Sequence, residues 1–168
     1  MGLIPRRKRR WDEQPTAPCE VLLASDGRRD FSERAIAEAI ALSPSGPIAV
    51  VTIARIYGTQ FGLPNPGLLP TKLEMEERQG WIGHAMDLLR SSGCAADAQL
   101  AVARKPTKTL LRIARARQPK TLVIDETFVT GLRRFIEGDV GTELTRKLRN
   151  DDITVVVIPA APPPQQAG

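Results

Sequence analysis

The chain has 168 residues, of which 42% are apolar, 26% charged and 4% aromatic, a composition typical of one globular domain. Its 24 lysines and arginines exceed its 19 aspartates and glutamates by five, and residues 6–10 are a run of five bases. The remainder of the chain is therefore formally neutral, which disfavours a domain that binds nucleic acid through cations spread over its folded surface. Two separated cysteines and one histidine disfavour a disulfide framework, a zinc site and a histidine-based triad.

The two ends of the chain have the composition of flexible segments. Residues 1–18 combine the basic run with three prolines and no apolar periodicity, and residues 160–168 read AAPPPQQAG. We expect one folded domain over residues 19–159 between them. No apolar run reaches the length of about 18 residues that a transmembrane helix requires, and no apolar core of a signal peptide follows the basic start. We therefore expect a cytoplasmic protein without a transmembrane segment.

Five apolar runs alternate with helical patterns between these ends. The runs cover residues 21–24, 48–56, 99–103, 121–124 and 153–158. They are nearly continuous, which is typical of parallel strands that helices cover on both faces. With right-handed crossovers and a single reversal of winding, they predict a Rossmann-like α/β fold with a five-stranded parallel sheet in the order 3-2-1-4-5.

The helical patterns predict four helices. They begin after Asp30, after Thr71, at Thr107 and near Asp139, and they end before Pro44, near Ser92, before Pro119 and near Arg149. Asp30 is expected as the first N-cap, because Glu33 follows it at the spacing of a capping box. Residues 57–70 are rich in glycine and proline and form a connection long enough to be a functional loop.

Several stretches of the sequence resemble the universal stress protein family over roughly residues 19–159. They are VLLASDG and IAVVTI at the first two strands, KPTKTLLRIARARQPKTLVI at the third helix and fourth strand, and GLRRFIEGDVGTEL before the terminal ITVVVIP. The resemblance implies a five-stranded parallel α/β sandwich and a regulatory or stress-response role. It also implies a homodimer through the fifth strand. The β-branched run over residues 154–158 agrees with this, because it would lie unguarded at a sheet edge.

Many members of that family bind ATP through a glycine motif between the fourth strand and the last helix. The motif reads Gly-x-x-Gly, nine residues, then Gly followed by Ser or Thr, and its glycines let the backbone approach phosphates at a helix N-terminus. Aligned on Gly138, the other three positions hold Asp125, Phe128 and Asp139. A second register, from Gly131 to Gly141, fits the spacing but places GLRR out of line with the family. The resemblance therefore implies a degenerate motif.

The acidic residues around this motif oppose a bound triphosphate. Asp139 can accept backbone N–H groups at the start of the last helix and so fill the place of a phosphate. Asp125, Glu126 and Glu137 add negative charge nearby. These acids could alternatively hold a Mg²⁺ ion that bridges to phosphates. We favour ordinary surface carboxylates, since helix N-termini favour acids without any ligand.

Asp26 is the stronger candidate for a ligand contact. It ends the first strand, where open α/β sheets bind ligands at the reversal of strand order, and an aspartate there meets the adenine side of ATP in the resembled family. A turn aspartate before Gly27 explains the sequence equally well. The candidate nucleotide site comprises Asp26, Gly27, Gly138, Asp139, Val140 and Gly141, and no catalytic or metal-ligating residue is indicated. Trp81 and His84 on the second helix are read as structural or surface residues.

These patterns together favour a universal-stress-type regulatory or stress-response protein that is non-enzymatic and binds nucleotide weakly or not at all. One alternative is an adenine-nucleotide (ATP) binding protein or slow ATPase that uses Asp26 and an acid-held metal. Another is a scaffold that contacts a polyanion through its basic run. That run comprises Arg6, Arg7, Lys8, Arg9 and Arg10. A solvated run without a partner remains the simpler interpretation of these five residues.

Overall fold

The computed structural model describes residues 17–56, 69–126 and 140–159. Within these ranges the chain forms five strands and four helices. They are β1 (Val21–Ser25), α1 (Glu33–Leu42), β2 (Ile48–Arg55), α2 (Lys72–Ser91), β3 (Ala96–Ala103), α3 (Pro106–Arg117), β4 (Thr121–Asp125), α5 (Val140–Leu148) and β5 (Thr154–Ile158). Residues 1–16 and 160–168 lie outside the described residues, as do 57–68 and 127–139, so Gly138 and Asp139 do as well.

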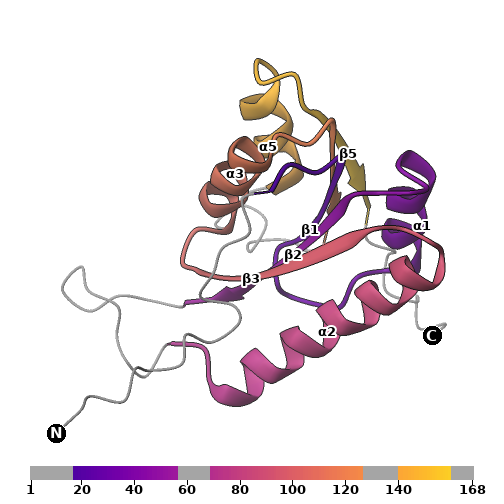
Figure 1. Cartoon of the computed structure of the whole chain (residues 1–168). Helices are drawn as coiled ribbons and strands as arrows, with labels where there is room; N and C mark the ends of the chain where they lie inside the picture. The colour runs from indigo at the N-terminus through magenta and orange to yellow at the C-terminus, as the bar shows by residue number, and fades with distance from the viewer. Residues whose placement is uncertain (1–16, 57–68, 127–139, 160–168) are drawn as a thin grey trace, which may run out of the picture.

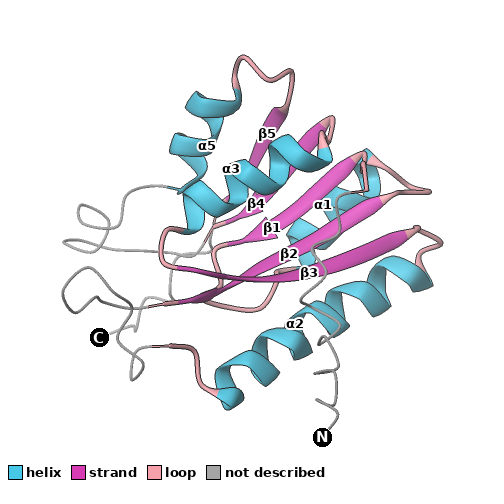
Figure 2. Ribbon diagram, turned by 60° about the vertical axis from the view of Figure 1, so that its left-hand side comes forward, coloured by secondary structure: helices cyan, strands magenta, loops and turns pink. Residues whose placement is uncertain are grey.

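The strands form one parallel sheet in the order β3-β2-β1-β4-β5, which confirms the predicted order. Strand β1 is central, and Val21 pairs in register with Ile48 on one side and with Thr121 on the other. Helices α1 and α2 cover one face of the sheet, and α3 and α5 cover the other (Figures 1 and 2). The chain therefore changes face between β1 and β4, and their carboxyl ends lie at the switch point.

The sheet separates two apolar cores. On β1, Leu22 and Ala24 pack in the core beneath α3 and α5, whereas Val21 and Leu23 pack in the core beneath α1 and α2. Both faces of the central strands are thus removed from water, which explains why their sequences are continuously apolar. Within the described residues, no helix is long and apolar enough to cross a membrane.

The N-cap of α1 is Ser32, so the prediction of Asp30 is wrong. The Ser32 hydroxyl accepts the backbone N–H of Ala35 at 3.2 Å. The Asp30 carboxylate instead accepts the N–H of Phe31 at 2.7 Å and lies 3.3 Å from His84 Nδ1 on α2. Asp30 therefore joins the two helices of this layer rather than beginning the first of them.

The predicted cap of α2 is confirmed, whereas the predicted start of β3 is wrong. Thr71 and Glu74 form a capping box, in which Glu74 Oε2 accepts the Thr71 N–H at 2.6 Å. Strand β3 begins at Ala96 rather than at Gln99, because its first residues extend the pairing with β2 back to Ile48. Their mixed polarity hid this extension from the apolar pattern.

Candidate functional site

The switch point brings together the residues that directly follow or end the two central strands. Ser25 of β1 pairs in register with Asp125 of β4, so Asp26 and Glu126 leave the sheet side by side. Open α/β sheets bind ligands at this edge. The carboxylates at the two strand ends therefore lie at the centre of the candidate site.

Asp26 is engaged by arginines of the chain itself. Its side chain is almost fully buried, and Oδ2 lies 3.1 Å from Arg55 Nη2 and 3.3 Å from Arg28 Nε. Oδ1 accepts the backbone N–H of Arg28 at 3.2 Å, which is the local turn bond that the sequence allowed. The carboxylate that the resemblance assigned to an adenine thus neutralises part of the positive charge of the edge.

Gly27 is held by a hydrogen bond from α2 and by close packing against β2. It has a φ of +85°, and its carbonyl oxygen accepts a hydrogen bond of 3.0 Å from Nη2 of the buried Arg78 on α2. The Arg78 guanidinium carbon also lies 5.0 Å from the centre of the Trp81 ring. The Trp81 ring thus contacts an arginine of its own helix.

Asp125 is 1% exposed and ties β4 to the start of α1. Its Oδ2 accepts the Ser32 N–H at 2.6 Å, and its Oδ1 accepts hydrogen bonds of 3.1 Å from the Ser32 hydroxyl and from Arg29 Nη2. The same residue takes the first glycine position of the degenerate ATP motif. Asp125 therefore accepts structural hydrogen bonds that a glycine at this position could not accept.

Glu126 contacts the described start of α5. Its Oε1 accepts the N–H of Gly141 at 3.1 Å, so a carboxylate from the end of β4 satisfies a free donor of this helix. A Cβ added to Gly141 would overlap that carboxylate and lie 2.9 Å from a methyl of Val157. The sequence assigned such a cap to Asp139, which lies outside the described residues.

The predicted site residues fall into two described groups. Asp26 and Gly27 lie at the end of β1, and Val140 and Gly141 lie at the start of α5, where Val140 packs against the core. Sequence reasoning missed the partner arginines, because Arg55 and Arg78 come from distant elements. Arg28 and Arg29 directly follow the SDG stretch, so their position was the one available signal.

The described residues contain no group of three or more histidine, cysteine, aspartate or glutamate side chains that could hold a metal ion. Asp26 and Asp125 each face arginines, and Glu126 faces a backbone N–H. These partners are not the open set of oxygen ligands that Mg²⁺ prefers.

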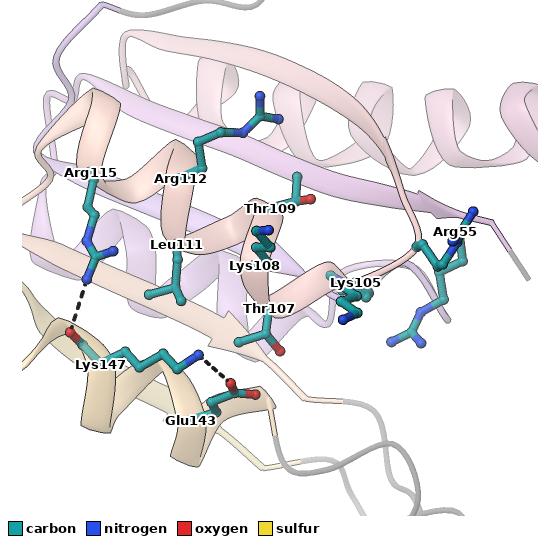
Figure 3. Close-up of a pocket in the computed structure, with 12 residues that line it drawn as sticks. Arg55, Lys105, Thr107, Lys108, Thr109, Leu111, Arg112, Arg115, Glu143 and Lys147 are labelled. Carbon is teal, nitrogen blue, oxygen red and sulfur yellow. Dashed lines mark hydrogen bonds and ion pairs between the residues drawn. The ribbon is translucent and has the colours of Figure 1, made fainter. Parts of the chain in front are cut away.

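A pocket of about 1190 Å³ lies next to this edge, on the side of α3 and α5 (Figure 3). Seven of the described residues that line it are basic, and one, Glu143, is acidic. Arg55 belongs to both places, since it lines the pocket and pairs with Asp26. The two bases that follow β3, Arg104 and Lys105, lie in the pocket mouth together with the start of α3.

No protein-family model and no curated protein matches the sequence. Solved structures do match the fold. A universal stress protein in complex with cAMP has a TM-score of 0.58 and 17% identity and covers 84% of this chain and 97% of its own. A universal stress protein from Archaeoglobus fulgidus has a TM-score of 0.57 and 19% identity and covers 85% of this chain and 93% of its own.

The Archaeoglobus fulgidus protein in complex with dAMP has a TM-score of 0.55 and 20% identity, and covers 85% of this chain and 98% of its own. All three likenesses extend over nearly the whole neighbour, and the strand order of this chain is the one that the resemblance implied. The chain is therefore a divergent protein with the universal stress protein fold.

Proposed function

We propose that this chain is a universal-stress-type regulatory protein that is non-enzymatic and in which the nucleotide site of the fold is weakened or lost. The observation that carries the proposal is the occupation of the switch point by the chain's own groups. Asp26 and Asp125 are held by arginines, and Glu126 accepts the Gly141 N–H.

Electrostatics at the start of α5 support this proposal. A helix N-terminus attracts anions through its free N–H groups and its partial positive charge. Here the Glu126 carboxylate already lies at that position, 3.1 Å from the Gly141 nitrogen. A phosphate would have to displace this carboxylate and would be repelled by it. Binding of a triphosphate should therefore be weak.

The alternative is an adenine-nucleotide binding protein or slow ATPase of the same fold. Two solved neighbours favour it, since one is a complex with cAMP and another a complex with dAMP. In this chain such a ligand would have to compete with Arg28 and Arg55 for Asp26. The two functions differ in the affinity that they require for the nucleotide.

Calorimetric titration of the full-length protein with Mg-ATP, cAMP and dAMP tests the proposal. We expect affinities weaker than micromolar for all three and no release of phosphate from ATP. The Glu126→Gln variant should strengthen Mg-ATP binding, because it removes the repelling charge at the start of α5. Glu38→Gln, on α1 in the opposite layer, is the matched control and should change nothing. Submicromolar binding of Mg-ATP to the wild type would favour the alternative.

A further inference from the structure

The charges of the folded part are segregated although their sum is close to zero. The described residues that line the pocket along α3 and α5 include seven bases and one acid, Glu143. Figure 3 shows Arg115, Arg112, Lys108 and Lys105 as a row that ends at Arg55, whereas Lys147 lies beside Arg115 on α5. We call this row and its pocket the basic groove. This surface is therefore positively charged, although the charges of the folded part sum to about zero.

Four bases of the groove have no side-chain partner among the described residues. Arg104, Lys105, Lys108 and Arg112 are all exposed, and none makes an ion pair there. They contrast with Arg115, which lies 3.2 Å from Asp151, and with Lys147, which lies 2.8 Å from Glu143. The groove thus keeps four uncompensated cations beside two neutralised ones.

The start of α3 adds to the positive potential of the groove. Lys105 is the N-cap of this helix, its side chain makes no capping hydrogen bond, and Pro106 occupies the first turn. The positive end of the helix dipole therefore faces the pocket mouth together with the free bases. Repulsion among these groups falls when an anion binds between them.

The form of the groove favours a linear anion over a compact one. Lys108, Arg112 and Arg115 follow α3, a helix of 12 residues that spans about 18 Å, and Arg104 and Lys105 directly precede it. These cations are therefore spread along a line instead of converging on one point. The described lining residues include no aromatic side chain on which a base could stack, whereas proteins that bind single-stranded nucleic acid commonly use such platforms. The described part of the groove thus offers contacts to successive phosphates and no aromatic platform for a base.

We propose that the basic groove binds a linear inorganic polyphosphate chain along α3. This site lies beside the switch point and is independent of the proposed loss of nucleotide binding. The free bases Lys108 and Arg112 would contact successive phosphates, with Arg104 and Lys105 at the mouth. Binding would release counterions and would therefore weaken steeply with added salt.

Fluorescence anisotropy with an end-labelled inorganic polyphosphate, across a series of salt concentrations, tests the proposal on the full-length protein. Lys108→Gln combined with Arg112→Gln should weaken binding at low salt by about tenfold or more and lower the salt slope by about two. Glutamine is a good helix former, so α3 should persist. The matched control is Arg34→Gln combined with Arg90→Gln, two exposed bases of α1 and α2 on the opposite layer, and it should bind as the wild type does.

A second full-length variant separates the groove from the basic run. It carries Arg6→Gln, Arg7→Gln, Lys8→Gln, Arg9→Gln and Arg10→Gln, and it should retain polyphosphate binding that still depends on Lys108 and Arg112. No binding to the wild type at low salt, loss of binding in this variant alone, or equal binding by the groove variant and the wild type would each overturn the proposal. Tighter binding of a single-stranded oligothymidine with the same number of phosphates would overturn the assignment to polyphosphate.

Discussion

Gly27 packs directly against the backbone of Ile53, so that a Cβ added to the glycine would overlap the Ile53 carbonyl oxygen and lie 2.7 Å from its carbonyl carbon. Gly27 also has a φ of +85°, which side chains rarely adopt. The turn after β1 therefore requires a glycine at position 27. The same turn sets the position of Asp26 relative to β2.

Gly27→Ala should lower the free energy of unfolding by about 1 to 3 kcal/mol for the backbone conformation and by more for the overlap with β2. Urea denaturation measures this change. Gly83→Ala is the control, because a Cβ there meets nothing within 4 Å and alanine favours the helix α2. Equal stability of Gly27→Ala and the wild type would contradict the packing described at this turn.

Arg117 is fully buried at the end of α3 and is paired with Asp97 of β3. Its Nε and Nη1 atoms have no hydrogen-bond partner among the described residues. Asp97→Ala should therefore destabilise the protein strongly, by roughly 3 kcal/mol, because it leaves a buried charge without compensation. Arg117→Met should cost less, since an apolar side chain of similar length needs no partner. Guanidinium denaturation of both variants measures the difference, and the reverse order of stability would contradict this account.

Strand β5 lies at the edge of the sheet, and its valines 155 to 157 are only partly buried. We predict a homodimer through this strand, since an unguarded β-branched edge invites pairing with another chain. Light scattering should give a dimer for the wild type and a monomer for a folded Val156→Lys variant. Val102→Lys, on the opposite edge strand β3, should leave the dimer intact. A monomeric wild type at high concentration would refute the prediction.

The stability of the protein should depend on the ionisation of Glu20. Hydrogen bonds from the Ser43 hydroxyl at 2.6 Å and from Lys120 at 3.4 Å hold the pKa of Glu20 below its ordinary value of 4.5. Because the folded pKa is the lower one, Glu20 stabilises the fold above pH 4.5 and loses this contribution as the pH falls through the folded value.

Denaturation of the wild type and of Glu20→Gln across a pH series checks this dependence. The two proteins should differ most near neutral pH, and the difference should shrink in acid. Ser43→Ala should move the pKa of Glu20 back toward 4.5, which a titration of its carboxyl resonance by NMR would detect. An unchanged pKa in that variant would show that Ser43 does not cause the shift.

The strand order and the layers followed from the sequence, because continuous apolar runs report burial on both faces. Local caps were predicted only where both partners lie within one turn, as in Thr71 with Glu74. Asp30 had the same spacing to Glu33, yet Ser32 caps α1. Asp125, 93 residues away, fixes the Ser32 backbone and hydroxyl in that position. The spacing of residues along the chain gives no information about such a long-range contact.

The candidate site was likewise predicted only in part. Asp26 and Gly27 could be placed at the end of β1 from the sequence, but the arginines around them could not. Arg55 and Arg78 reach the edge only after the sheet and α2 have assembled. The basic groove was hidden for a related reason, because a sum over the chain loses the separation of its charges in space.

The contacts at the carboxyl edge join residues that are far apart in the chain, which has a consequence for folding kinetics. Arg29 and Asp125 are 96 residues apart, and Gly27 and Arg78 are 51 apart. Because closing long loops costs entropy, we expect these bonds to form late on the folding pathway, after the transition state. Arg29→Gln should therefore accelerate unfolding while leaving the refolding rate nearly unchanged. Faster unfolding of this variant would show that the arginines of the edge prolong the lifetime of the native state.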